Sequence, residues 1–210
     1  MPESAARGRF ISLEGVDGAG KSTHAAWLAA ALAARGHRVV KTREPGGTAL
    51  GEALRSVLLT EPMTRETEAL LMFAARREHV ATVITPAIER GDWVVCDRFT
   101  DATYAYQGGG HGVAREFLDV LARLVHANCN PDLTLLFDVP IEISRARLSK
   151  AAHEGRELDK FEREEQAFFE RVRAAYLARA NAEPARFRII DSSRPVAAVR
   201  AELAEIVAAV

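Results

Sequence analysis

An eight-residue run, Gly15-Val-Asp-Gly-Ala-Gly-Lys21-Ser22, constrains this chain more than any other feature. It matches the pattern G-x-x-x-x-G-K-[ST] in full and directly follows an apolar, strand-like segment at residues 10–14. The glycines let successive backbone N–H groups turn toward one anion, and a following helix adds the positive end of its dipole. The run therefore predicts a strand, a phosphate-binding loop (P-loop) and a helix, with Lys21 bridging the β- and γ-phosphates of a nucleotide and Ser22 holding Mg²⁺.

The rest of the chain alternates between short apolar runs and segments with helical spacing. Strands are expected at 10–14, 39–42, 93–96, 132–139 and 187–190. Helices are expected at 21–35, 49–59, 67–89 with a kink or restart at Pro86, 113–127, 141–149, 164–181 and 196–210. Residues 107–110 are expected to form a flexible loop and residues 150–160 a polar one. This order predicts an α/β fold of the P-loop NTPase type: a five-stranded parallel sheet with helices on both faces. No linker divides the chain, so residues 1–210 are expected to form a single domain.

The composition of the chain limits the kinds of partner and location that can be expected. The chain has 28 basic and 29 acidic residues and a formal net charge of −1, so nothing favours binding to a nucleic-acid polymer. The longest apolar run, residues 25–34, is far shorter than the roughly 20 residues that cross a membrane. The first nine residues lack the apolar core of a secretory signal, which predicts a cytoplasmic protein. Cys96 and Cys129 form no metal-ligand pattern and are expected to be reduced thiols.

Charged residues also follow two of the other predicted strands. Asp97 and Arg98 end one strand, and Arg43 ends another, before Pro45 and two glycines. Ligands of open parallel sheets collect at the carboxyl ends of the strands, so these side chains are expected at the site. Asp97 suits the magnesium shell, whereas Arg98 and Arg43 suit phosphoryl oxygens.

Together, four segments closely resemble the thymidylate kinase family. They are FISLEGVDGAGKS at 10–22, TREPGGT at 42–48, DRF at 97–99 and AYQGGG at 105–110. The resemblance runs from about residue 9 to the C-terminus and implies a kinase that moves the γ-phosphoryl group of ATP to dTMP, giving dTDP and ADP. It also implies Mg²⁺ as cofactor and a homodimer.

The resemblance assigns roles by position. The residues that would bind the ATP phosphates are Gly15, Val16, Asp17, Gly18, Ala19, Gly20, Lys21, Ser22 and Thr23. Asp17 would also contact the sugar 3′-hydroxyl, Arg43 and Arg98 would hold the dTMP phosphate, and Asp97 would support Mg²⁺. Around the nucleoside, the peptide bond before Pro45 would be cis, Thr103 and Gln107 would line the thymine pocket, and Tyr106 would pack beneath the sugar, excluding a ribose 2′-hydroxyl.

The helix beside the thymine pocket departs from the family pattern. An ungapped alignment puts Arg76 at the thymine carbonyl and Met72 over the base, where the family has phenylalanine. Phe73 and Arg77 keep the same spacing in an alternative register, but a slip of one residue rotates the helix face by about 100°, so both pairs cannot serve. We favour Arg76 because the downstream Glu-His-Val spacing supports it, and expect Phe73 in the core.

A second departure concerns the lid. Gly18 stands where some relatives have a catalytic arginine, so the resemblance assigns that role to a lid over about 147–160, with Arg147 and Arg156 as candidates. Adenine is expected near 188–195, and the histidines are interpreted as surface or packing residues. Two alternatives stay open: a kinase for another base, and a P-loop protein that switches a binding surface. The latter needs a glutamine that orients water, and Gln107 is the only candidate.

Overall fold

Five apolar runs form one parallel sheet, as predicted, with the strand order β2-β3-β1-β4-β5. The computed structural model describes residues 7–157 and 159–209. Its strands are β1 (Phe10–Glu14), β2 (Val39–Arg43), β3 (Trp93–Asp97), β4 (Leu133–Asp138) and β5 (Phe187–Asp191). Every residue of β1 is buried because β1 lies at the centre of the sheet with helices on both faces, which explains why apolar residues predominate in it.

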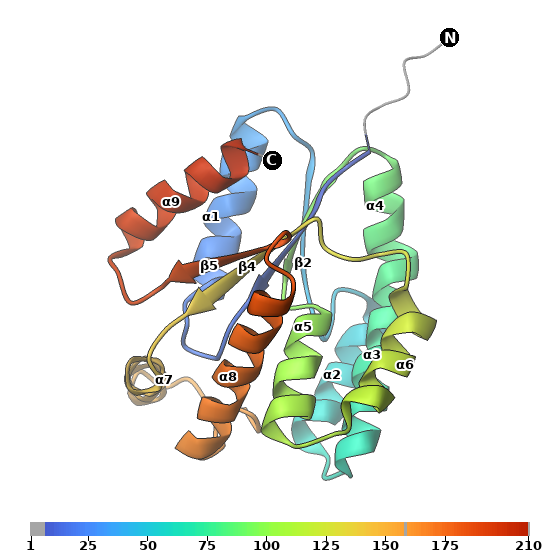
Figure 1. Cartoon of the computed structure of the whole chain (residues 1–210), viewed down its shortest axis with the longest axis vertical. Coiled ribbons are helices and arrows are strands. Elements are labelled where there is room, and N and C mark those ends of the chain that lie inside the picture. The colour runs from blue at the N-terminus through green and yellow to red at the C-terminus, as the bar shows by residue number, and fades with distance from the viewer. Residues whose placement is uncertain (1–6, 158, 210) are drawn as a thin grey trace.

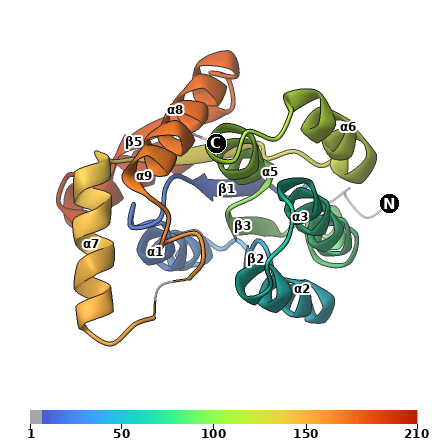
Figure 2. The ribbon, with the colours of Figure 1, turned by 90° about the horizontal axis from the view of Figure 1, so that it is seen from below.

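Nine α-helices surround the sheet within the described ranges. They are α1 (Lys21–Ala34), α2 (Ala49–Thr60), α3 (Arg65–His79), α4 (Thr85–Glu89), α5 (Thr100–Thr103), α6 (Arg115–His126), α7 (Ile141–His153), α8 (Gln166–Ala182) and α9 (Val196–Ala208). Helices α1 and α9 pack together on one face, and α5 and α8 pack on the other (Figures 1 and 2). Threonine side chains cap two starts: Thr48 accepts from Gly51 N at α2, and Thr64 accepts from Thr67 N at α3.

Two π-helical segments were not predicted. Segment η1 (Val80–Ile84) joins α3 to α4, so the helix restarts just before Pro86, whose nitrogen has no hydrogen to donate. Segment η2 (Tyr104–Gly110) continues α5 through residues expected to be a flexible loop, so that expectation was wrong. A β-carbon on Gly109 or Gly110 would lie 2.5 Å from Ala175 or 2.4 Å from the ring of Phe168. The glycines there let η2 pack closely against α8.

Helix boundaries elsewhere differ by a few residues. Helix α7 continues to His153, four residues beyond the expected Ser149, which shortens the polar segment of the lid. Leu158, inside the expected lid, and Val210, at the expected end of the last helix, lie outside the described residues.

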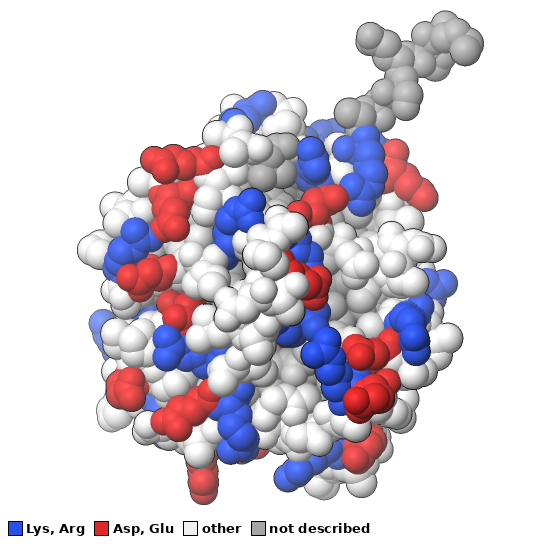
Figure 3. Space-filling view, viewed as in Figure 1, with Lys and Arg blue, Asp and Glu red and all other residues white. Residues whose placement is uncertain are grey.

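The distribution of charge on the surface agrees with the nearly balanced numbers of basic and acidic residues. Basic and acidic side chains alternate across the face shown in Figure 3, without a continuous basic area. Among residues 7–157 and 159–209, no helix is both long and apolar enough to cross a membrane.

Candidate active site

The P-loop joins β1 to α1 and lies at the carboxyl edge of the sheet. Gly18 and Gly20 have positive φ angles of 76° and 91°, and a β-carbon on Gly18 would lie 2.6 Å from the carbonyl oxygen of Ser144. Val16 and Ala19 are buried in the core, so only their backbone groups can face a phosphate. The remaining predicted residues from Asp17 to Thr23 line one open pocket.

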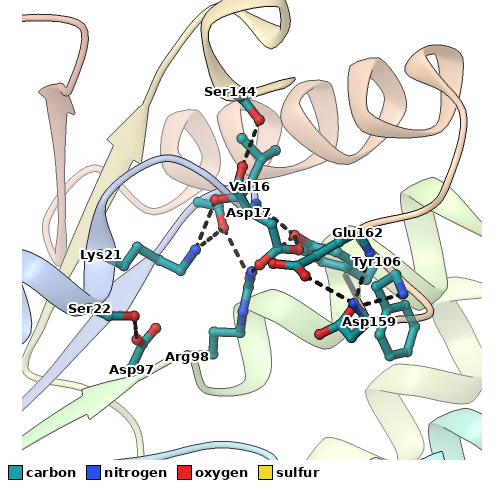
Figure 4. Close-up of polar contacts among 12 residues, drawn as sticks. Val16, Asp17, Lys21, Ser22, Asp97, Arg98, Tyr106, Ser144, Asp159 and Glu162 are labelled. Carbon is teal, nitrogen blue, oxygen red and sulfur yellow. Dashed lines mark hydrogen bonds and ion pairs between the residues drawn. The ribbon is translucent and has the colours of Figure 1, made fainter. Parts of the chain in front are cut away.

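Lys21 lies folded against its own loop. Its Nζ donates to the carbonyl oxygens of Gly15, at 3.0 Å, and Val16, at 2.8 Å (Figure 4). Burial, and then the nearby charge of Arg98, lower the pKa of Lys21 to about 8.

The two predicted magnesium ligands lie together. Ser22 Oγ donates to Asp97 Oδ2 over 2.8 Å, so a hydroxyl from the P-loop and a carboxylate from the end of β3 face one point. Both side chains offer oxygen atoms, which are the ligands that Mg²⁺ prefers.

Arg98 is the centre of the polar site. It has a positive φ of 71°, and its guanidinium donates to Asp17 Oδ1 at 2.5 Å, Tyr106 OH at 3.0 Å and Tyr176 OH at 3.1 Å. Tyr106 OH in turn donates to Asp17 Oδ2 at 2.6 Å. Burial opposes ionisation of Asp17, but the charges of Arg98 and Lys21 outweigh it and lower the pKa of Asp17 to about 2. The three predicted residues, Asp17, Arg98 and Tyr106, therefore form one charged cluster (Figure 4).

Behind this cluster, Glu14 is wholly buried at the end of β1. Its carboxyl group accepts from Phe99 N at 2.8 Å and from Tyr176 OH at 2.9 Å. Burial and then the charge of Asp101 raise the pKa of Glu14 to about 8. The sequence reasoning missed Glu14, because a glutamate in an apolar strand does not reveal its partners.

A second cavity adjoins the cluster and collects the predicted nucleoside-binding residues. Of the residues predicted to bind substrate, it is lined by Asp17, Pro45, Met72, Arg76, Arg98, Thr103, Tyr106 and Gln107. The exception, Arg43, lines the neighbouring P-loop pocket and pairs with Glu52 at 2.7 Å. The expected cis peptide bond before Pro45 is present.

The structure favours one of the two registers on α3. Arg76 and Met72 line the cavity, whereas Arg77 is exposed and Phe73 is buried in a cluster with Val113 and Leu118. The preference for Arg76 and the expectation that Phe73 belongs to the core agree with this packing.

Arg76 is held by a buried polar network. Its Nε donates to Glu44 Oε2 at 2.7 Å, and its Nη2 donates to Thr103 Oγ1 at 3.0 Å and to the carbonyl of Phe99 at 3.2 Å. Nη1 is buried and has no partner among the described residues. Burial opposes the charge of Glu44, but Arg76 and His79 outweigh it and lower the pKa of Glu44.

His79 belongs to the same network and is no surface residue. It is fully buried, and its ring nitrogens lie 2.9 Å from Glu44 Oε1 and 2.7 Å from Thr42 Oγ1. The sequence contains Glu44, next to Pro45, and the downstream histidine, but nothing in it shows that they meet.

Arg55 is a functional candidate that the sequence reasoning missed. It lines both pockets, and its Nη1 donates to the carbonyl of Pro45 at 3.2 Å. Burial, and then the charge of Arg43, lower its pKa. The sequence feature that could have revealed Arg55 is its position on the predicted helix directly after Arg43 and Pro45.

Both candidate arginines of the lid line the P-loop pocket. Arg147, on α7, donates to the carbonyls of Gly18 at 3.2 Å and Ser192 at 2.9 Å. Arg156 lies beyond the helix and pairs with Glu162 at 2.9 Å. Ser144, also on α7, donates to the carbonyl of Asp17 at 2.6 Å, so α7 contacts the P-loop directly (Figure 4).

A P-loop at the carboxyl edge of a parallel sheet, an adjacent cavity and the arginines that line the P-loop pocket define a P-loop kinase of small nucleotides. Comparison with known proteins identifies the group. The family model described as thymidylate kinase matches residues 13–203. The chain belongs to the thymidylate kinase family.

Individual relatives agree with this assignment. The chain is 66% identical over 198 residues to a thymidylate kinase of Bordetella petrii, covering 94% of each chain. It is 60% identical over 206 residues to one of Cupriavidus taiwanensis, covering 97% of this chain and all of the relative. A crystal structure of thymidylate kinase from Ehrlichia chaffeensis superposes with a TM-score of 0.78 at 32% identity, covering 96% of this chain and 99% of that one.

Proposed function

We propose that this chain transfers the γ-phosphoryl group of ATP to the phosphate of dTMP, giving dTDP and ADP. The pattern of donors and acceptors in the nucleoside cavity carries the proposal. Arg76 Nη1 is a buried donor without a partner, so it suits a carbonyl oxygen. Gln107 Nε2 already donates to Glu68, which leaves its Oε1 as an acceptor. A 4-oxo pyrimidine with a hydrogen on N3 matches both side chains. Cytosine does not, because it has a donor amino group at C4 and an unprotonated acceptor at N3.

The remaining cavity residues suit the rest of the nucleoside. Met72 is partly buried and supplies a soft apolar contact for the base. Thr103 holds the guanidinium of Arg76, and Tyr106 offers its ring to the sugar while Asp17 accepts from the 3′-hydroxyl. This arrangement supports a preference for deoxynucleotides.

Phosphoryl transfer needs mainly positioning and charge, because a phosphate oxygen is already a competent nucleophile. Arg98 and Arg43, joined by Arg55, would hold the dTMP phosphate, and residues 15–23 would hold ATP. Lys21 would leave its own loop carbonyls to reach the β- and γ-phosphates. Arg147 or Arg156 would then add positive charge from the lid.

Ser22 and Asp97 would hold Mg²⁺. No group of three or more metal-binding side chains occurs in the part of the chain that the structure describes, so phosphate oxygens would complete the shell. When bound, the ion neutralises charge on the phosphates.

The two other interpretations fit less well. In a nucleotide switch Gln107 would orient water at the γ-phosphate, but it lines the nucleoside cavity and donates to Glu68. A kinase for another base would need a different pair of groups in place of Arg76 and Gln107.

A homodimer would use the layer of α2, α3 and α6. Five of the eight exposed large apolar side chains among the described residues lie on α3 and on the two helices that pack against it: Leu50, Val57, Leu70, Val120 and Leu124. Such a gathering is typical of an interface. We expect Leu124→Lys, at a side chain that is 75% exposed, to yield monomers in light scattering, while Val196→Lys on α9 leaves dimers. A monomeric parent chain at micromolar concentration would contradict this.

A cytoplasmic location suits a kinase that uses ATP and has two free, buried cysteines. The activity is tested by ADP formation with ATP, Mg²⁺ and a panel of dTMP, dUMP, UMP, CMP, AMP and GMP. We expect turnover with dTMP to exceed turnover with every other acceptor. Preference for a different base, or hydrolysis without an acceptor, would overturn the proposal.

A further inference from the structure

Glu68, near the start of α3, is buried at the meeting point of three segments. Its Oε1 accepts from Gln107 Nε2 on η2 at 2.9 Å, and its Oε2 accepts from Lys160 Nζ, at the end of the expected lid, at 2.5 Å. His111 Nε2 lies 3.6 Å from Oε1. Glu68 does not line the nucleoside cavity, whereas Gln107 does.

These contacts determine which end of the Gln107 amide faces the cavity. An ionised carboxylate can only accept hydrogen bonds, so Gln107 must turn its NH₂ group toward Glu68. The ammonium group of Lys160 compensates the negative charge at this buried position. The side-chain Oε1 of Gln107, which does not contact Glu68, then remains as an acceptor for the base.

We propose that Glu68 is a positioning residue for base specificity, which acts by holding the Gln107 amide in the orientation that accepts from N3–H. The inference rests on the proposed function, because it concerns the same cavity. Without Glu68 the amide can rotate and offer NH₂ to an unprotonated N3, as in a 4-amino pyrimidine. Arg76 is fixed separately by Glu44, so this loss relaxes discrimination without abolishing it.

The test compares dTMP with 5-methyl-dCMP, which keeps the methyl group and the sugar but has a 4-amino group. For each variant, the ratio of kcat/KM for the two acceptors is measured; where turnover of 5-methyl-dCMP is undetectable, its inhibition constant against dTMP is used. Glu68→Gln keeps the size of the side chain but can pair with either orientation of Gln107. Glu66→Gln, at an exposed position two residues earlier, is the matched control.

A double-mutant cycle separates positioning from general damage. We expect Glu68→Gln to lower the ratio of kcat/KM for dTMP to kcat/KM for 5-methyl-dCMP about tenfold or more in the parent chain. The reason is that the substitution affects one buried hydrogen bond of the base. In a Gln107→Leu background the same substitution should change the ratio less than about twofold. Glu66→Gln should leave the ratio unchanged.

An equal effect of Glu68→Gln in both backgrounds, or a loss of kcat with an unchanged ratio, would overturn the inference. If Glu68→Gln does not fold, as judged by circular dichroism, Glu68→Asp replaces it, because Asp keeps the charge but withdraws from Gln107. An unchanged ratio in folded Glu68→Asp would then be the contrary result. Failure of the proposed function is a different outcome, because the parent chain itself would not prefer dTMP.

Discussion

Replacing Arg76 with methionine should damage stability and base recognition by two separable routes. The substitution removes one partner of a buried ion pair: the side chains of Arg76 and Glu44 are only 2% and 3% exposed. Glu44 keeps its contact with His79 at 2.9 Å, but it loses the positive charge of the Arg76 guanidinium. Removing one partner of such a pair costs about 3–5 kcal/mol, which for a chain of this length lowers the midpoint of thermal unfolding by about 6–20 °C.

The two routes are separated by removing the unpaired charge of Glu44. In the double variant Glu44→Gln/Arg76→Met no carboxylate remains unpaired, so part of the lost free energy of unfolding should return. A deficit of about 1–3 kcal/mol should remain, because Phe99 O and Thr103 Oγ1 lose their donor. Recognition should not return, since the donor toward the 4-oxo group is absent in both variants.

Urea unfolding followed by circular dichroism gives the free energies, and calorimetric titration with dTMP gives the affinities. A loss below about 1 kcal/mol for Arg76→Met would refute the assignment of a buried, uncompensated charge. Restored dTMP affinity in the double variant would refute the role of Arg76 Nη1 at the base.

Two further predictions concern the charged cluster. Because the pKa of Glu14 is raised from 4.5 unfolded to about 8 folded, the folded chain binds more protons in this window and loses stability as pH rises, by up to about 1.4 kcal/mol per pH unit. Glu14→Gln should remove this contribution, so its stability relative to the parent should increase from pH 5 to pH 8 in urea unfolding; parallel curves would contradict it. Tyr106→Phe removes the hydroxyl shared by Asp17 and Arg98, so it should cost about 1 kcal/mol and raise KM for dTMP in steady-state assays. Its preference for dTMP over 5-methyl-dCMP should not change, and a changed preference would argue against separate sugar and base contacts.

The sequence was sufficient to predict the sheet and to place together the residues expected to bind phosphate. Those features depend on local rules: a glycine loop between a strand and a helix, and charged residues where parallel strands end. Thus Lys21, Ser22, Asp97 and Arg98 could be placed at one edge before any coordinates were known.

The nucleoside end could be predicted only in part, because it depends on which way side chains turn after packing. Spacing left Arg76 and Arg77 as alternatives with Arg76 favoured, and the burial of Phe73, with Arg76 lining the cavity, supports that choice. The glycines at 108–110 indicated a loop, but their actual role is close packing of η2 on α8.

The groups that hold the recognition residues were missed for the same reason. Glu68 is 39 residues from Gln107 and 92 from Lys160 in the sequence, so no local pattern links them. Only the packing of α3 against η2 and against the end of the expected lid brings these groups together.

The central claim is that Arg76 and Gln107 read the 4-oxo and N3–H groups of thymine in the cavity beside the P-loop. A crystal structure of the chain with dTMP and a non-hydrolysable ATP analogue tests it most directly. We predict the thymine O4 atom within hydrogen-bond distance of Arg76 Nη1 and the N3 atom within the same distance of Gln107 Oε1. A base bound outside this cavity, or bound in it without contact to either group, would contradict the account.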